Sequence, residues 1–323
     1  MLLEVRDLAA SFFLDEGELK AVDGVSFELD IGETLALVGE SGCGKTIVAL
    51  ALLGIVPSPG RVIGGSIRFD GIELVGADSA DLRRARGKGM GIVFQEPGAA
   101  LNPVMTVGRQ ISDVVQFHRG LSRHDADADA VRLLGLMGIA EPEKRAKAYP
   151  HELSGGMRQR ATIAIAVSAR PKLLIADEPT TALDVTIQAE ILDLIAQLQR
   201  DFGMALLIIS HDIGVVEALA DRVMVMYAGK LCEAGSADAV FGDPRHPYTK
   251  ALLGAVPRLG VGRDTPLIGI PGAVPDLLAL PPGCSFQPRC ALGDASCTVE
   301  FPPLRTIAGR RCACYKVADA LTR

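Results

Sequence analysis

The chain has 323 residues, enough for about two domains, and its 49% hydrophobic content gives a mean hydropathy of +0.28. The longest nearly unbroken apolar run, 47–56, is well short of the ~20 residues that a bilayer span needs, and charged residues at positions 4, 6 and 7 interrupt any leader peptide, so we expect a cytoplasmic protein without a secretory signal. A formal net charge of -6 argues against a duplex-DNA binder.

Short apolar runs alternate with glycine turns over the first third of the chain. The runs at 35–38, 66–69 and 90–94 predict strands, and the run at 47–53 predicts a buried helix after the first of them. From 102 to about 160 the pattern becomes helical and polar, which predicts a helical insertion.

The middle of the chain returns to alternating strands and helices. Strands are predicted at 173–176 and 205–209, and apolar residues at helical spacing between them predict a helix over 187–198, ended by Gly203. After about residue 240, repeated prolines exclude long regular elements, so 241–323 is predicted to be a loop-rich extension. The aliphatic, aromatic-poor composition favours an α/β fold with buried parallel strands.

A complete phosphate-loop motif, G-x-x-x-x-G-K-[ST], lies between the first predicted strand and the helix that follows it. Its glycines let successive backbone N–H groups face a phosphate, its lysine reaches the outer phosphates, and its threonine hydroxyl can bind Mg²⁺. An ordinary glycine turn would not need lysine and threonine in register, and a dinucleotide-binding loop would need G-x-G-x-x-G. The predicted nucleotide-binding residues of the loop are Gly39, Ser41, Gly42, Cys43, Gly44, Lys45 and Thr46.

The strand predicted at 173–176 supplies a second half of such a site. Asp177 follows this strand, where its carboxylate can hold Mg²⁺ directly or through water, and the adjacent Glu178 can polarise an attacking water. Two surface acids at a strand end would be the ordinary interpretation if the phosphate loop were absent.

A third anion-binding pattern, Leu-Ser-Gly-Gly-Met-Arg-Gln-Arg at 153–160, precedes the same strand. A serine hydroxyl and glycine N–H groups at a helix N-terminus suit a phosphate. With this signature the chain resembles the ATP-binding cassette (ABC) ATPases. The resemblance implies a head-to-tail dimer in which Ser154, Gly155, Gly156 and Gln159 contact the ATP that the partner subunit binds.

Four further positions match the pattern of this family in order. The resemblance implies that Gln95 contacts Mg²⁺ and the attacking water, that Asp184 belongs to the D-loop at 182–184, and that His211 contacts the γ-phosphate. Phe12 falls where the family places an aromatic ring that stacks on adenine, and the adjacent Phe13 is the alternative.

The resemblance covers essentially the whole chain. The segments 149–160, 176–188 and 246–249 look like the ATPase subunits of bacterial dipeptide, oligopeptide and nickel importers, and 94–97 and 102–107 look like the first of the two paired ATPases. This implies a P-loop ABC ATPase core at 1–240, with an N-terminal antiparallel β subdomain and an inserted helical subdomain at about 96–160, followed by the extension.

The resemblance also implies a function and partners. An ATPase of this kind powers import of peptides from the cytoplasmic face of the bacterial inner membrane, where it is peripheral. Its partners would be a second homologous ATPase subunit, in a heterodimer or a homodimer, two transmembrane permease subunits and, indirectly, a substrate-binding protein, without nucleic acid. The cargo stays open between peptides, nickel and another solute.

Two rival functions remain. A non-transport ABC ATPase acting on nucleic acid or ribosomes typically carries a coiled coil between loop and signature, or two cassettes in tandem, and this sequence has neither. A regulatory cassette whose tail senses redox state is the other.

Five of the seven cysteines crowd into the extension. Four of them have the spacing C-x5-C-x6-C-x16-C, and a matching pattern recurs in the importer branch. Four thiolates can hold zinc or an iron–sulfur cluster, and the spacings lack the C-x2-4-C pairs that zinc usually prefers, so we favour a 4Fe-4S cluster over Zn²⁺, with free thiols as the remaining alternative. The candidate ligands are Cys284, Cys290, Cys297 and Cys314, whereas Cys312 and Cys43 are interpreted as a bystander and a small filler.

Overall fold

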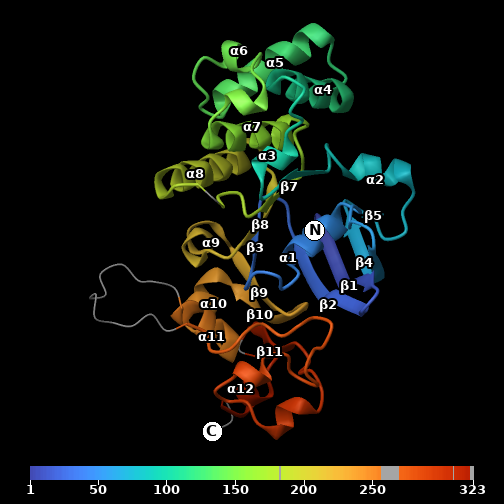
Figure 1. Ribbon diagram of the computed structural model, residues 1–323, viewed down its shortest axis with the longest axis vertical. Coiled ribbons are helices and arrows are strands. Elements are labelled where there is room, and N and C mark those ends of the chain that lie inside the picture. The colour runs from blue at the N-terminus through green and yellow to red at the C-terminus, as the bar shows by residue number, and fades with distance from the viewer. Residues whose placement is uncertain (182, 256–268, 308, 321–323) are drawn as a thin grey trace. The chain divides into compact units, whose positions relative to one another are not determined.

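Strands and helices alternate through the computed structural model, which describes residues 1–181, 183–255, 269–307 and 309–320 (Figure 1). The chain divides into two units. Unit 1 comprises residues 1–3, 29–33 and 68–208, and unit 2 comprises 4–28, 34–67 and 209–323. Among the helices of the described ranges, none combines the length and the hydropathy that a bilayer span requires.

The N-terminal part of unit 2 is an antiparallel sheet. In it, β1 (Leu3–Leu14) lies between β2 (Gly17–Leu29) and β4 (Gly60–Phe69). Burial follows a period of two near the end of β2, where Val25, Phe27 and Leu29 face the core. The last two residues of β4 belong to unit 1, where they pair antiparallel with β5 (Ile72–Glu73). This confirms the predicted antiparallel β subdomain.

A second group of strands in unit 2 begins with β3 (Thr34–Val38). This strand is buried along its whole length and pairs parallel with β9 (Arg222–Tyr227), as expected for a parallel strand covered on both faces. On the other side of β9, antiparallel pairing continues through β10 (Lys230–Ser236), β12 (Arg310–Cys312) and β11 (Arg305–Ile307). The C-terminal extension thus adds two strands that its prolines concealed.

The helices of unit 2 are short. They are α1 (Lys45–Leu52), α9 (Ile213–Leu219), α10 (Ala237–Gly242), α11 (Pro247–Gly254) and α12 (Tyr315–Ala320), with 3₁₀ turns at Gln287–Arg289 and Ala295–Thr298. Of the described elements that begin after residue 240, none exceeds the eight residues of α11. The prediction of a loop-rich extension is confirmed for the part of it that the structure describes.

Unit 1 contains the parallel pair β6 (Met90–Val93) and β7 (Leu173–Asp177), and residues 205–208 of β8 (Ala205–Ser210), which neighbours β7. Its helices are α2 (Ser79–Ala85), α3 (Pro97–Ala100), α4 (Val107–Arg119), α5 (Arg123–Leu136), α6 (Pro142–Arg145), α7 (Gly155–Ser168) and α8 (Val185–Phe202), with a 3₁₀ turn at Pro150–Glu152. Contacts among α4, α5 and α7 form the predicted helical insertion (Figure 1).

The helix predicted at 187–198 is α8, which is longer at both ends. The Asp184 carboxylate caps its first turn by accepting a hydrogen bond from the Ile187 N–H, and Gly203 ends it in the left-handed region, with φ of +63°. The five predicted strands correspond to β3, β4, β6, β7 and β8, and each prediction ends within one residue of the observed C-terminal end.

Candidate nucleotide site

The phosphate loop connects β3 to α1 in unit 2. Gly44 directly precedes α1 in the left-handed region, with φ of +103°, and a Cβ atom there would lie 2.1 Å from the Ala21 carbonyl oxygen. A Cβ atom on Gly39 would lie 2.2 Å from the Met226 carbonyl oxygen. Both positions therefore require glycine because neighbouring backbone leaves no room for a side chain.

Lys45 is the first residue of α1 and is 4% exposed. Its Nζ donates hydrogen bonds to the carbonyl oxygens of Gly39, at 2.9 Å, and Glu40, at 3.0 Å. The Sγ atom of Cys43 lies 3.8 Å from the same ammonium, and burial raises the pKa of this thiol. Cys43 thus fills the space beneath the loop, as a small side chain was expected to do, and the lysine is held inside the curl of the loop.

The start of α1 presents backbone donors rather than a capped end. Among the described residues, no side chain caps this helix, and Ser41, Gly42 and Thr46 are exposed. The first N–H groups of a helix have no partner within the helix and carry a partial positive charge, so this end suits an anion such as a phosphate.

The two candidate adenine-stacking rings differ in their surroundings. The Phe12 ring is half-buried against Gly60, where a Cβ atom would lie 2.6 Å from it. Phe13 is 41% exposed, and the Arg61 guanidinium lies 4.4 Å from its ring centroid. His211, the predicted switch histidine, is exposed directly after β8. The roles of these residues stay predictions.

Unit 1 carries the predicted catalytic carboxylates at the end of β7. Asp177 is the last residue of this strand and is 2% exposed, and Glu178 follows with φ of +47°, a conformation that costs a non-glycine residue about 1–3 kcal/mol. Gln95 and Thr181 both donate to Oε2 of Glu178 at 2.9 Å. These two hydrogen bonds hold the strained turn and aim its carboxylate.

The Gln95–Glu178 contact joins a residue whose role the family resemblance implied to one predicted from the strand that precedes it. Gln95 follows β6, and Glu178 follows β7. The carboxyl ends of neighbouring parallel strands meet at one edge of a sheet, which explains the contact. Thr181 was not predicted. Sequence offered no signal for it beyond its place three residues after the glutamate.

The signature segment begins α7. Ser154 is its N-cap and accepts a hydrogen bond from the Met157 N–H at 3.3 Å. Ser154 and Gly155 are exposed, and a Cβ atom on Gly155 would meet nothing within 4 Å, whereas one on Gly156 would lie 3.2 Å from Ile187. An anion could therefore approach the start of this helix closely.

Gln159 occupies a different environment from the rest of the signature. It is 1% exposed, and its side-chain amide donates to the Pro179 carbonyl oxygen at 2.6 Å. The turn that holds Glu178 is thus tied to the signature helix within unit 1. The contact of Gln159 with a partner's ATP stays a prediction. Of the predicted D-loop, Asp184 is exposed at the start of α8, and Ala182 lies outside the described residues.

The four candidate cysteine ligands of the extension line one hollow in unit 2, together with His246 and Phe286. Burial raises the pKa of the Cys284 thiol to about 11 and also raises the pKa values of Cys290 and Cys314, while Cys297 is buried. Within the described residues, no three His, Cys, Asp or Glu side chains meet at metal-binding geometry. The hollow brings the four thiols together without arranging them as metal ligands.

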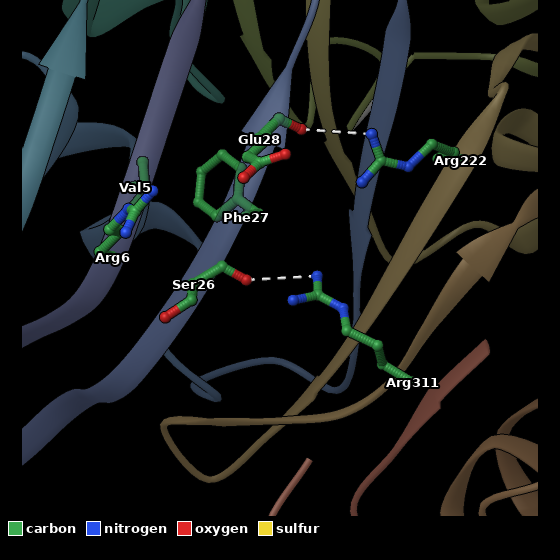
Figure 2. A pocket seen from close by; sticks show the side chains of 7 residues that line it. All are labelled: Val5, Arg6, Ser26, Phe27, Glu28, Arg222 and Arg311. Carbon is green, nitrogen blue, oxygen red and sulfur yellow. Dashed lines mark hydrogen bonds between the residues drawn. The ribbon is translucent and has the colours of Figure 1, made fainter. Parts of the chain in front are cut away.

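Two arginines bind β9 and β12 to the backbone of β2 (Figure 2). Arg311 donates to the Ser26 carbonyl oxygen at 3.3 Å, and Arg222 donates to the Glu28 carbonyl oxygen at 3.4 Å. Both line a pocket of about 330 Å³, and burial lowers the pKa of Arg311. Sequence reasoning did not find this attachment of the extension.

Comparisons with known proteins agree with the sequence and the fold. The family model "ABC transporter" matches residues 22–181, and "Oligopeptide/dipeptide transporter, C-terminal region" matches residues 232–297. The "Oligopeptide transport ATP-binding protein OppD" of Salmonella typhimurium is 48% identical over 99% of this chain and 95% of its own length. The protein of the same name from Bacillus subtilis is 49% identical over 94% of this chain and 85% of its own length.

Solved structures lead to the same family. The dimeric ATP-binding cassette MJ0796, in a post-hydrolysis state bound to ADP and phosphate, has a TM-score of 0.66 and 25% identity, over 73% of this chain and 99% of that one. The structure of cbiO1 from Clostridium perfringens, part of the ABC transporter complex cbiONQ, has a TM-score of 0.63 and 28% identity, over 75% of this chain and 91% of that one. The chain belongs to the ABC transporter family, among the ATPase subunits of oligopeptide importers.

Proposed function

We propose that this subunit binds ATP on its phosphate loop and hydrolyses it with Glu178 to power import of peptides across the bacterial cytoplasmic membrane. The observation that carries the proposal is the contact of Gln95 with Glu178, in a chain whose buried Lys45 is held inside a loop that only glycine permits. The names of the relatives supply the peptide cargo.

Glu178 is the proposed general base. In hydrolysis the water oxygen attacks the γ-phosphorus, the bond to the β–γ bridging oxygen breaks, and a proton of the water passes to the Glu178 carboxylate. Gln95 orients this carboxylate through its 2.9 Å hydrogen bond, and His211 contacts the γ-phosphate. Phosphoryl transfer depends mainly on positioning and on stabilisation of charge, which is what these side chains supply.

Thr46, Gln95 and Asp177 are the proposed ligands of Mg²⁺. Their hydroxyl, amide and carboxylate oxygens are the hard donors that this ion prefers, and Asp177 is a nearly buried carboxylate at the end of a parallel strand. A bound Mg²⁺ would neutralise charge on the β- and γ-phosphate oxygens.

The signature is proposed to act on a second nucleotide. Ser154 and Gly155 are exposed at the start of α7, where their hydroxyl and N–H groups suit the γ-phosphate of an ATP on a partner's phosphate loop. Asp184 would face the same partner. The dimeric state of the MJ0796 cassette supports a head-to-tail pair, and a second, homologous ATPase is the proposed partner. Recovery of a single kind of ATPase subunit would instead indicate a homodimer.

The membrane location is proposed to come from partners, since none of the described helices is suited to span a bilayer. The test is purification of the tagged full chain from the native cell after mild detergent extraction. We expect two multispanning permease subunits and ATP-dependent uptake of a labelled oligopeptide after reconstitution with a substrate-binding protein. Retention on nucleic acid or ribosomes without permeases would contradict the proposal. Uptake of nickel but not of peptide would show that nickel, rather than peptide, is the transported solute.

We also propose that the four thiols lining the hollow of the extension hold a 4Fe-4S cluster. Four sulfurs around one hollow, with no carboxylate among its lining residues, favour a soft metal over Mg²⁺ or Ca²⁺. Cys284, Cys290, Cys297 and Cys314 would be the ligands, and the bound cluster would organise a loop-rich segment. Anaerobic purification followed by iron and sulfide analysis tests this. A finding of zinc alone would show that the thiols bind zinc instead of a cluster. A finding of neither metal nor sulfide would show that the thiols are free.

A further inference from the structure

Among the described residues of the extension, Arg289 is the charged side chain with the most complete set of hydrogen bonds. Its Nε donates to the Pro271 carbonyl oxygen at 2.8 Å, and its other N–H groups reach both carboxylate oxygens of Glu40, at 2.8 and 3.1 Å, the Tyr227 hydroxyl at 3.2 Å and the Ile270 carbonyl oxygen at 3.4 Å. A guanidinium has five N–H donors, so every donor of Arg289 has an acceptor. These hydrogen bonds hold the Arg289 side chain in a single conformation.

Glu40 is the second residue of the phosphate loop, and it is held at three points. Its N–H donates to the Tyr248 hydroxyl at 2.9 Å, its carbonyl oxygen accepts from Lys45 Nζ at 3.0 Å, and its carboxylate accepts the bidentate pair from Arg289. Two of these three contacts come from residues after 240, in the extension. The conformation of the loop around its lysine is therefore fixed from outside the motif.

The contacts lie in a well-packed place. The Arg289 side chain is 5% exposed and that of Glu40 is 24% exposed, so water screens the ion pair only weakly. Tyr227, Tyr248 and Phe286 are buried and pack on one another with ring centroids 4.6 to 5.3 Å apart, and the Arg289 guanidinium lies 5.8 Å from the Tyr227 ring. This cluster prevents Arg289 from swinging away from Glu40.

We propose that Arg289 is a positioning residue for the ATP site, which sets the phosphate loop in its nucleotide-binding conformation through Glu40. The proposal rests on the proposed role of the loop in binding ATP. Without the Arg289 bond, Glu40 keeps only its backbone contacts with Tyr248 and Lys45, and the loop occupies the binding conformation for a smaller fraction of the time. Apparent nucleotide affinity falls in proportion to that fraction.

The extension offers a matched control for loss of a structural attachment. Arg311 also binds the extension to the rest of unit 2, but through the Ser26 carbonyl oxygen in β2 rather than through the phosphate loop (Figure 2). A purely structural role of Arg289 would make Arg289→Met and Arg311→Met alike, with lower stability and unchanged nucleotide affinity.

The test measures binding of a fluorescent ATP analogue, and KM and kcat for ATP, in the full chain assembled with its partners. We expect Arg289→Met and Glu40→Gln each to weaken nucleotide binding and raise KM by roughly 5- to 30-fold, which is within the range of a typical coupling between sites. We expect kcat to change less than threefold and Arg311→Met to leave both constants within twofold. The double variant Glu40→Gln/Arg289→Met should bind no more weakly than either single variant, since the two residues act as a unit.

Arg289→Lys keeps the charge but loses the two-pronged geometry, and we expect it to give an intermediate affinity. It also serves if Arg289→Met does not fold. Wild-type affinity in Glu40→Gln, multiplicative effects in the double variant, or an equal loss in Arg311→Met would overturn the proposal. Loss of kcat with intact affinity would also overturn it. Loss of all ATP binding in the unchanged protein would instead contradict the proposed role of the loop.

Discussion

The side-chain amide of Gln95 donates a 2.9 Å hydrogen bond to Oε2 of Glu178, on the turn that follows the neighbouring strand. Thr181 donates to the same oxygen, and the backbone of Glu178 is in the left-handed region. The glutamate is thus held in a strained position by two side chains that sit outside its own strand. Such strain persists only where the surroundings enforce it, and it gathers at functional sites.

Replacing Glu178 with glutamine removes the proposed base while keeping the size of the side chain. We expect ATP to bind with affinity within threefold of wild type, and hydrolysis to fall by about 10²- to 10⁴-fold, the usual contribution of a general base. Steady-state ATPase rates and filter binding measure the two quantities. Hydrolysis at the wild-type rate would show that Glu178 is not the base.

Replacing Gln95 with alanine removes one of the two donors to Glu178. We expect kcat to fall by about 10-fold or more, because one hydrogen bond to a charged group contributes about 1.5–3 kcal/mol, with nucleotide affinity changed less. Steady-state kcat and the Kd for ATP, measured separately, distinguish the two effects. A loss of affinity with unchanged kcat would place Gln95 in binding rather than in positioning.

The glycines of the phosphate loop offer a test of space against backbone conformation. Gly44→Ala would bring a Cβ atom to 2.1 Å from the Ala21 carbonyl oxygen, and we expect it to weaken ATP binding by more than about 10-fold. Gly42→Ala shares a positive φ, of +79°, but its Cβ atom meets nothing within 4 Å, so we expect a smaller loss. Isothermal titration calorimetry with ATP compares the affinities of the two variants. An equal loss of affinity would assign the effect to backbone strain alone.

The buried amide of Gln159 should stabilise unit 1. Gln159→Met leaves the Pro179 carbonyl oxygen without its 2.6 Å hydrogen bond, so we expect the free energy of unfolding to fall by about 1–3 kcal/mol. The exposed Gln197→Met is the control, with an expected change of less than about 0.5 kcal/mol. Urea denaturation followed by circular dichroism measures both. Equal free energies of unfolding for Gln159→Met and Gln197→Met would mean that the contact contributes nothing to stability.

Two neighbouring cysteines separate metal binding from packing. Cys314 lines the hollow of the extension, and Cys312, two residues earlier, is fully buried outside it. We expect Cys314→Ala to lower the iron content of anaerobically purified protein by at least about half, and Cys312→Ala to keep it, because a cluster needs four sulfur ligands. Elemental analysis measures the iron content of both variants, and equal contents would argue against the proposed ligand set.

The elements that carry chemistry could be predicted from the sequence alone, because each depends on short-range rules. The loop around Lys45 follows from glycine spacing between a strand and a helix, the acidic pair follows from an apolar run that ends in Asp177, and the end of α8 follows from Gly203. Periodicity and turn chemistry are properties of neighbouring residues, so they can be read along the chain.

The distant residues that support these elements could be identified only in the folded chain. The contact between Arg289 and Glu40 joins positions 249 residues apart, Gln95 and Glu178 are 83 apart, and β12 pairs with β10 despite the prolines around it. Such contacts depend on how strands order themselves in a sheet and on which side chains pack together, and local patterns do not encode either. The sequence therefore identified the loop that receives the phosphate, and the folded chain showed what holds that loop in place.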